Sequence, residues 1–186
     1  MRVITGDLKG RRIPFNNNRF GNARVTSDFV KEAAFATLGP VAGERFLDLF
    51  AGSGQIGLEA WSRGADVTLN EQDGRRYQFI KSLVEEWGIR ERLQISRKNA
   101  FAFLSSSNDD PVDVAYLDPP YHETLRETPL AQAALEAFVT SPLAAPHTRV
   151  LLQHHTSFEL PESVNGFTPS RSKVYGETCL TTYVAA

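Results

Sequence analysis

The sequence of 186 residues predicts a doubly wound α/β fold, in which helices cover both faces of one mostly parallel sheet. One observation is the alternation of short apolar segments, typical of buried strands, with longer segments of helical periodicity. Strands are expected near residues 45–50, 65–70, 93–96, 112–117 and 148–154, and helices near residues 55–63, 73–87, 99–105 and 124–139. A second observation is that the β-rich segments 168–175 and 178–184 are separated by Gly176-Glu177, a hairpin signal. We therefore expect seven strands, with an antiparallel hairpin at the end of the sheet.

The amino-terminal residues precede this alternation and are predicted to form a small β-hairpin extension. Residues 1–14 contain turn dipeptides at Gly6-Asp7 and Lys9-Gly10, and the asparagine-rich residues 16–22 are typical of a polar, mobile loop. We assign residues 1–25 to this hairpin and loop.

A helix is expected to begin near Thr26 or Ser27 and to end at Gly39-Pro40, which cannot continue it. Its apolar stripe is predicted at Phe29, Val30, Ala33, Ala34 and Leu38. The main domain is then expected to cover residues 26–186.

The strand near residues 45–50 leads into a glycine-rich turn and then into a helix. Gly52 and Gly54 allow positive φ and close approach of a ligand to the backbone. With Gly57 they also satisfy G-x-G-x-x-G, so a dinucleotide site of the NAD type is one interpretation. Asp48 favours another, because a carboxylate four residues before the first glycine suits a ligand with an amino group better than a pyrophosphate. S-adenosylmethionine has an amino group, a cationic sulfonium and no phosphate.

Polar residues also follow the next two strands. Glu71 comes 19 residues after Gly52, about the spacing at which an acidic side chain reaches a ribose diol, although it could equally be a solvated loop carboxylate. Asn99 and Ala100 follow the third strand and could contact an adenine edge, but Asn99 could instead only cap the next helix.

The most informative motif is Asp118-Pro119-Pro120-Tyr121, directly after the strand at residues 112–117. The Asp118 carboxylate and a backbone carbonyl of the proline pair are acceptors that match the two donors of an exocyclic amino group on a nucleobase. Tyr121 adds an aromatic face that can stack on the base. A simple turn ended by prolines is the alternative interpretation.

Taken together, these motifs resemble those of the class I S-adenosylmethionine-dependent amino-methyltransferases. Nearly all 186 residues are similar to the RsmD family of bacterial small-subunit (16S) ribosomal RNA guanine-N2 methyltransferases. The resemblance implies a Rossmann-like methyltransferase sheet and methyl transfer to N2 of a guanine. Residues 24–32 depart from the family's usual Arg-Pro-Thr-Thr-Asp-Arg-Val-Arg-Glu, notably at Val25, Phe29 and Lys31, which concerns RNA contact more than the chemistry.

The expected roles follow from the motifs and the resemblance. Cofactor contacts are expected from Asp48, Phe50, Ala51, Gly52, Ser53, Gly54, Glu71, Gln72, Asn99, Ala100 and Thr26. The catalytic residues are expected to be Asp118, Pro119, Pro120 and Tyr121, with Asp118 and the Pro119 carbonyl accepting hydrogen bonds from the amine as it becomes positively charged. The target base must be unpaired or flipped to reach them.

Charge is unevenly distributed. Residues 1–31 carry seven basic and two acidic side chains, a balance of +5, and the whole chain is −2, so the remainder carries −7. Such a basic arm can dock on phosphates, although a charged segment is often only a solvated face. The expected RNA contacts are Lys9, Arg11, Arg12, Arg19 and Arg24.

Composition suits one cytoplasmic domain: 41% of the residues are hydrophobic, no segment has membrane-spanning length, and the lone Cys179 cannot form an internal disulfide. The four histidines show no metal-ligand spacing, so no metal is expected, and we expect a monomer that acts on ribosomal RNA or the assembled ribosomal particle. Two alternatives stay open. One is a DNA adenine or cytosine amino-methyltransferase, and the other is an NAD-dependent oxidoreductase or a nucleotide-binding module.

Overall fold

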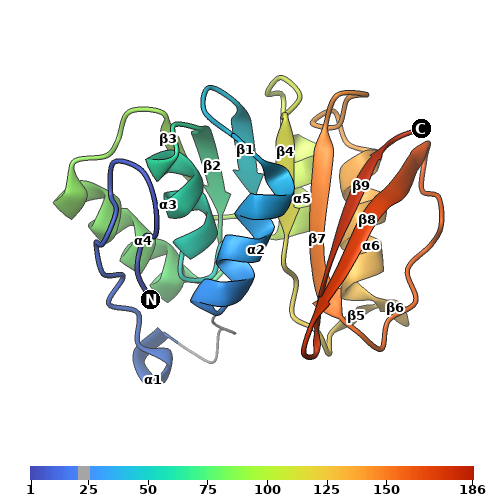
Figure 1. Cartoon of the computed structure of the whole chain (residues 1–186), viewed down its shortest axis with the longest axis horizontal. Helices are drawn as coiled ribbons and strands as arrows, with labels where there is room; N and C mark the ends of the chain where they lie inside the picture. The colour runs from blue at the N-terminus through green and yellow to red at the C-terminus, as the bar shows by residue number, and fades with distance from the viewer. Residues whose placement is uncertain (21–25) are drawn as a thin grey trace.

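The computed structural model describes residues 1–20 and 26–186 and contains one seven-stranded sheet (Figure 1). The strand order is β3-β2-β1-β4-β7-β9-β8. The strands are β1 (Arg45–Asp48), β2 (Asp66–Asn70), β3 (Leu93–Ser96), β4 (Val114–Leu117), β7 (Arg149–His155), β8 (Phe167–Tyr175) and β9 (Thr178–Ala185). Strands β1 to β4 and β7 run parallel, whereas β9 is antiparallel to both β7 and β8. The predicted doubly wound sheet with a closing hairpin is confirmed.

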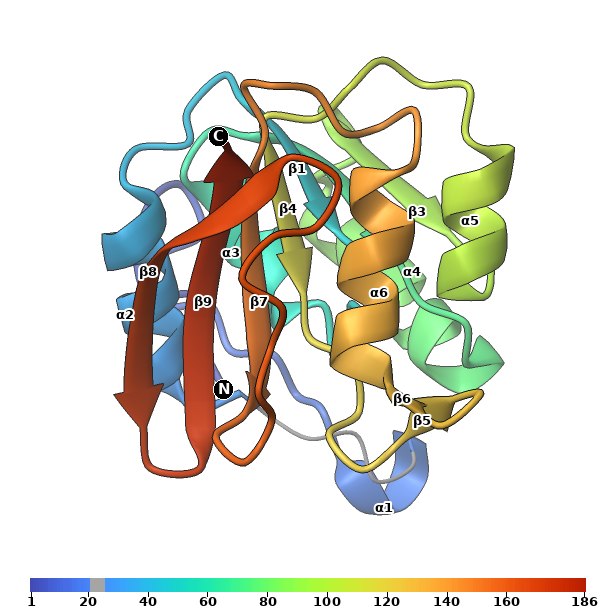
Figure 2. The same ribbon diagram turned by 90° about the vertical axis from the view of Figure 1, so that its right-hand side faces the viewer.

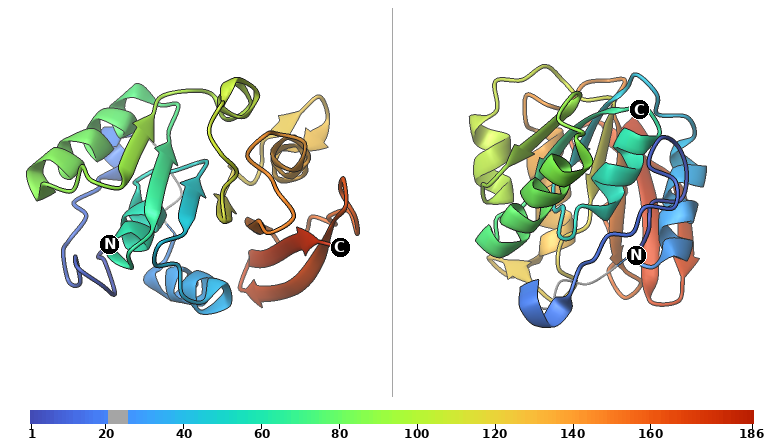
Figure 3. Two further views of the ribbon diagram at one scale, coloured as in Figure 1. Left: turned by 90° about the horizontal axis from the view of Figure 1, so that it is seen from above. Right: turned by 90° about the vertical axis from the view of Figure 1, so that its left-hand side faces the viewer.

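Helices cover both faces of the sheet, as Figure 3 shows from above. One face packs against α2 (Asp28–Leu38), α3 (Gln55–Ser62) and α4 (Gly74–Trp87), and the other against α5 (Ala100–Ser106) and α6 (Leu130–Val139). Each face has its own apolar cluster. The predicted pattern of layers is therefore present.

The helix expected near residues 124–139 begins later than predicted. Strands β5 (Thr124–Leu125) and β6 (Thr128–Pro129) form a small antiparallel pair, and α6 begins at Leu130. The turn residues Arg126 and Glu127 have φ values of 48° and 72°, which a tight two-residue hairpin turn requires. The prediction was wrong here because the turn contains no glycine or asparagine to mark it.

The amino-terminal residues double back as expected, but their mutual β-pairing is one isolated bridge between Arg2 and Arg12. Within this segment, the N–H groups of Val3, Gly10 and Ile13 donate to the carbonyls of Arg11, Val3 and Met1. Other backbone donors bond to α3. The N–H of Asp7 donates to the Ser62 carbonyl (2.9 Å), and that of Leu8 to the Ser62 hydroxyl (2.8 Å). A Cβ on Gly6 would lie 1.7 Å from the Ser62 carbonyl oxygen, so glycine is required at this contact. We call residues 1–13 the arm.

The arm belongs to the main core. Val3, Leu8 and Ile13 are buried in the cluster that α2 and α3 share. The predicted domain boundary lies after residue 25, and residues 21–25 are outside the part of the chain that the structure describes.

Part of the expected mobile loop is ordered, because the short helix α1 (Asn17–Phe20) follows the arm. The Phe20 ring lies 4.8 Å from Phe79 on α4 and 5.3 Å from Phe15, measured between centroids. These contacts hold the segment against the protein, which its asparagine-rich sequence did not indicate.

Helix α2 begins after Ser27, whose hydroxyl accepts the Val30 N–H, as predicted. Val30, Ala34 and Leu38 are buried, but Phe29 is 66% exposed. Its inclusion in the inward stripe was wrong. Residues 30, 34 and 38 lie four apart and define the buried face, and position 29 lies off it.

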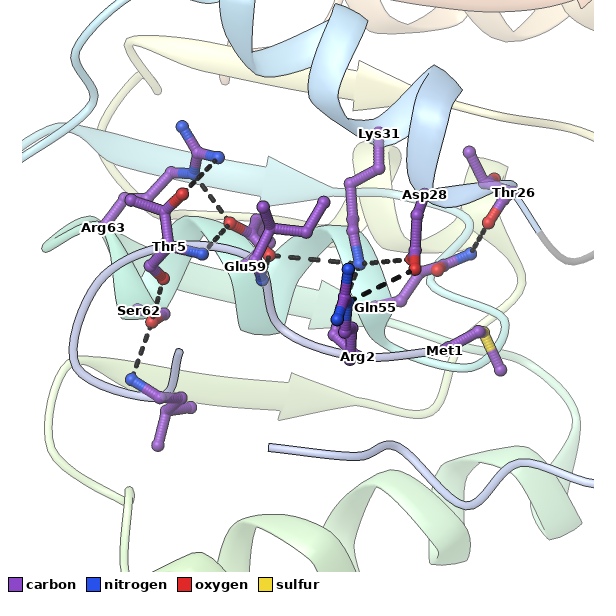
Figure 4. Close-up of polar contacts among 12 residues, drawn as sticks. Met1, Arg2, Thr5, Thr26, Asp28, Lys31, Gln55, Glu59, Ser62 and Arg63 are labelled. Carbon is purple, nitrogen blue, oxygen red and sulfur yellow. Dashed lines mark hydrogen bonds and ion pairs between the residues drawn. The ribbon is translucent and has the colours of Figure 1, made fainter. Parts of the chain in front are cut away.

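A buried ion pair joins α2, α3 and the arm (Figure 4). Lys31 and Glu59 have no exposed side-chain surface, and Lys31 Nζ lies 3.9 Å from Glu59 Oε2. Lys31 also donates to the Arg2 carbonyl. The Glu59 carboxylate accepts the N–H groups of Ile4 (2.7 Å) and Thr5 (3.0 Å). The departure at Lys31 was expected to affect RNA contact, but this side chain is buried and holds the arm in place.

We predict that Glu59→Gln lowers the free energy of unfolding by about 3–5 kcal/mol, because it removes the buried counter-charge of Lys31 and leaves only the half-exposed Asp28, 3.3 Å from Lys31 Nζ. Urea unfolding would measure this. The matched control is Glu85→Gln, which breaks the exposed pair between Glu85 and Arg90 (3.3 Å) and should cost at most about 1 kcal/mol. Equal losses in the two variants would contradict the structural role of Glu59.

Candidate active site

The carboxyl ends of the parallel strands meet at the lower edge of the sheet in Figure 1, where ligands bind in this class of fold. A cavity of about 1270 Å³ opens there. Its lining contains all four predicted catalytic residues and every predicted cofactor residue except Gly54. The space exceeds the roughly 300–1000 Å³ of common ligand sites, so two ligands can share it.

The glycine turn connects β1 to α3 and forms one wall of the cavity. Gly52 and Gly54 have φ values of 56° and 77°, the region that favours glycine. Gly57 has a different role, because a Cβ there would lie 2.1 Å from a Leu69 methyl group. The third glycine of the G-x-G-x-x-G pattern thus allows α3 to pack on β2.

Asp48 ends β1 and is buried, with its Oδ2 accepting the Gly57 N–H at 3.0 Å. Burial raises the pKa of the Asp48 carboxyl to about 8. The Gly57 hydrogen bond opposes this rise, and the charges of Asp118 and Glu71 add to it. The position therefore favours a cationic ligand, which would stabilise the ionised carboxylate.

Glu71 follows β2 and is 5% exposed. Its Oε2 accepts the Gly52 N–H (2.7 Å), and its Oε1 accepts the Asp73 N–H (2.8 Å) and an Arg76 guanidinium N–H (3.0 Å). This burial contradicts the alternative of a solvated loop carboxylate. Contact with a ribose stays a prediction.

Asn99 caps α5, which is one of the two roles that the sequence suggested for this residue. Its Oδ1 accepts the N–H groups of Phe101 (3.0 Å) and Ala102 (3.5 Å). Its amide also donates to Gln72 Oε1 at 3.2 Å. Asn99 also lines the cavity, so its role as a helix cap does not conflict with the predicted contact to an adenine.

The Asp118–Tyr121 motif follows β4, as predicted. The Thr26 hydroxyl donates to Asp118 Oδ2 (3.3 Å), and the Gln55 amide donates to the Thr26 carbonyl (2.9 Å; Figure 4). Thr26, expected among the cofactor contacts, is thereby placed against the Asp118 carboxylate, which is predicted to be catalytic. Gln55, the first residue of α3, was missed, although its place directly after Gly54 could have drawn attention to it.

The Tyr121 ring is held at the edge of the cavity. It is 7% exposed, its hydroxyl donates to Thr178 Oγ1 (3.3 Å), and its ring packs edge-on against His155 with centroids 5.8 Å apart. The end of β7 and the start of β9 therefore fix the position of this ring. Stacking on a base stays a prediction.

Further lining residues were not predicted. They are Tyr116, whose hydroxyl donates to Gln153 Oε1 at 2.5 Å, together with Arg76, Lys98, Phe101 and His122. Tyr116 is inside β4 and looked like a core residue. Arg76 and Lys98 are not part of any recognisable sequence motif, so nothing in the sequence marked them.

The predicted RNA contacts Lys9, Arg11, Arg12 and Arg19 are exposed, and Arg24 lies outside the described residues. The arm begins at the glycine turn, where the Ser53 hydroxyl meets Met1 Sδ at 3.6 Å, and its tip reaches Ser62 at the far end of α3. Arg12, paired with Arg2, therefore lies nearer to the cavity than Lys9 in the tip.

Within the described part of the chain, no group of three or more His, Cys, Asp or Glu residues is placed to hold a metal ion. None of its helices combines the length and the apolar character needed to cross a membrane.

Comparison with known proteins gives a family match over residues 1–184, to the family described as Conserved hypothetical protein 95. The Ribosomal RNA small subunit methyltransferase D of Buchnera aphidicola subsp. Acyrthosiphon pisum (strain APS) is 38% identical over 125 residues, which are 66% of this chain and 64% of that protein. YlbH of Bacillus subtilis (strain 168), provisionally named an rRNA methyltransferase, is 32% identical over 98% of each chain.

Among solved structures, yhhF of Escherichia coli, provisionally named a methyltransferase, superposes with a TM-score of 0.81. The two chains are 27% identical, and the match covers 100% of this chain and 97% of that one.

We predict that Asp48→Asn stabilises the protein increasingly as the pH rises. The raised pKa of Asp48 means that its stabilising contribution is complete below about pH 4 and is lost as the pH rises to about 8. The loss is up to about 1.4 kcal/mol per pH unit, and asparagine does not share it. Urea unfolding at pH 5, 6.5 and 8 should show the two proteins diverging, whereas parallel profiles would rule out the raised pKa.

Proposed function

The chain belongs to the Conserved hypothetical protein 95 family, and we propose that it transfers a methyl group from S-adenosylmethionine to N2 of a guanine in small-subunit (16S) ribosomal RNA. Relatives along its length are named as methyltransferases of ribosomal RNA, and the chain is a methyltransferase. The observation that carries the proposal is the Asp118–Tyr121 motif, which faces a cavity shared with Asp48 and Glu71.

The residues present fit this cofactor. Asp48 offers a buried carboxylate to its ammonium group, and Glu71 offers lone pairs to its ribose. A Cβ on Gly52 would find its nearest neighbour 3.9 Å away, so the turn leaves space for close approach. Asn99 and Ala100 line the cavity where an adenine would lie. When bound, S-adenosylmethionine supplies an electrophilic methyl group.

Asp118 and the Pro119 carbonyl hold the target amine. The lone pair of an exocyclic amine is delocalised into the ring, so the nitrogen must pyramidalise before it attacks. Two acceptors orient its protons away from the line of attack and stabilise the positive charge that develops. The nitrogen then loses one proton, to Asp118 or to water, and S-adenosylhomocysteine is the leaving group. Thr26 fixes the carboxylate at one oxygen. Correct positioning of the two reactants can lower the barrier by roughly 7–11 kcal/mol.

The RNA must present an unpaired or flipped guanine, because the atom that reacts lies inside a duplex stack. The exposed cations of the arm and α1 offer contacts to phosphates beside the cavity. A folded ribosomal particle, with the target loop already shaped, is expected to be a better substrate than free RNA.

The test compares transfer of a tritiated methyl group to small ribosomal subunits, naked 16S RNA and DNA, all from a strain lacking the protein. Mass spectrometry of the nucleosides then identifies the methylated base and atom. We expect N2-methylguanosine from RNA. Methylated adenine or cytosine from DNA alone would overturn the proposal in favour of a DNA enzyme.

We predict that Asp118→Asn binds the cofactor normally but transfers methyl groups about 10²–10³ times more slowly, because it removes charge stabilisation from the transition state. Single-turnover rates and calorimetric titration with S-adenosylhomocysteine would separate the two effects.

Glu71→Gln is the comparison for Asp118→Asn. It should weaken cofactor binding more than it slows the bound complex, since Glu71 holds the glycine turn and faces the ribose. Matching losses of affinity and rate at Asp118 would contradict its assigned role.

For RNA binding, we predict that replacing Arg11 and Arg12 with alanine weakens affinity while leaving cofactor binding unchanged. Each arginine that contacts a phosphate should flatten the log–log dependence of affinity on salt by about 0.7–0.9. Filter binding across a salt series measures this slope. An unaltered slope with full activity on ribosomal particles would exclude the arm as a docking element.

A further inference from the structure

Two aromatic side chains meet on the surface beside the candidate active site. Phe29 lies in the first turn of α2 and Tyr175 at the end of β8, with ring centroids 5.6 Å apart and planes at 80°. Phe29 is 66% exposed, the most open of the large hydrophobic side chains that the described residues leave exposed. A ring so open to water gains little from packing, so burial does not account for it.

The pair borders the catalytic motif. Phe29 is three residues after Thr26, which donates to Asp118, and Tyr175 is three residues before Thr178, which accepts from Tyr121. Three residues span at most about 11 Å, so both rings lie close to the cavity mouth. Figures 1 and 2 agree that the first turn of α2 and the β8–β9 turn lie at the same edge of the sheet.

The strand beside the pair is basic. Arg171 and Lys173 are exposed, and β8 contains no acidic residue. Alternation along a strand puts both on the face that carries Tyr175. The exposed carboxylates of Glu32, one turn along α2, and Glu177, in the hairpin turn, flank the pair. Phosphates are therefore expected to approach over β8.

We propose that Phe29 and Tyr175 bind an unpaired nucleobase next to the target guanine by stacking, while Arg171 and Lys173 contact the adjoining phosphates. Aromatic rings combined with cations are the usual way to bind single-stranded RNA, and stacking accepts any base. A stacked neighbour would keep the flipped guanine from returning to its helix. This inference rests on the proposed function, because it takes the ligand to be the RNA substrate.

The test measures binding of 16S RNA and small ribosomal subunits, both from a strain lacking the protein. Phe29→Ala should lower affinity between about 5- and 160-fold, the effect of losing one stacked base, with S-adenosylhomocysteine affinity unchanged. Phe29→Trp should retain affinity, and its fluorescence should be quenched by RNA beyond the change seen in the wild-type protein.

The cations are tested with a matched pair of variants. Lys173→Ala should flatten the salt slope by about 0.7–0.9. Arg90→Ala, which removes another exposed cation near the start of β3 at the opposite edge of the sheet, should leave the slope unchanged.

The outcomes separate this inference from the proposed function. Wild-type methylation of RNA together with unaltered binding by Phe29→Ala would overturn the stacking site alone. Failure of the wild-type protein to methylate either RNA would overturn the proposed function, and the inference with it.

Discussion

Burial of the Glu59 carboxylate in the middle of α3 is the constraint on which the arrangement of this protein depends. An ionised group without exposed surface is tolerated only when its charge is paired and its lone pairs accept hydrogen bonds. All eight residues of α3 are buried, because the sheet covers one side and the arm the other. Lys31, Arg63 and the N–H groups of Ile4 and Thr5 satisfy Glu59. Because the buried Glu59 carboxylate needs partners from both α2 and the arm, it holds these two segments against α3.

This arrangement also positions the chemistry. Helix α3 starts at the glycine turn, and α2 starts just after Thr26, so the buried ion pair sets how these two ends meet. Gln55 from α3 holds Thr26, and Thr26 holds Asp118. The arm, which is proposed to dock RNA, therefore packs on α3, the helix that begins at the wall of the cavity. Asp118 lies just beyond β4, and its carboxylate is held in place by residues that adjoin the ends of two helices.

Local patterns predicted most of the sheet and most of the site. The turn at Gly52 and the Asp118–Tyr121 motif each contain their signal within a few residues, and both lie where the sequence placed them. Features that depend on distant partners were missed. Lys31 looked like a surface cation because Glu59, which allows its burial, lies 28 residues away. The arm pairs with itself at Arg2 and Arg12 as expected, but its sequence does not indicate that α3 accepts hydrogen bonds from its remaining backbone donors.

Three carboxylates, Asp48, Glu71 and Asp118, share one edge of the sheet, and each is held differently. The Gly57 N–H donates to the buried Asp48, backbone donors and Arg76 neutralise much of Glu71, and the Thr26 hydroxyl orients Asp118. Burial raises the pKa of Asp48, and the neighbouring charges of Asp118 and Glu71 raise it further. A ligand with an ammonium and a sulfonium relieves the repulsion and returns Asp48 to its charged form with loss of a proton. A pyrophosphate would add two negative charges to the same edge, so the electrostatics argue against the NAD-type interpretation that the glycine pattern alone leaves open.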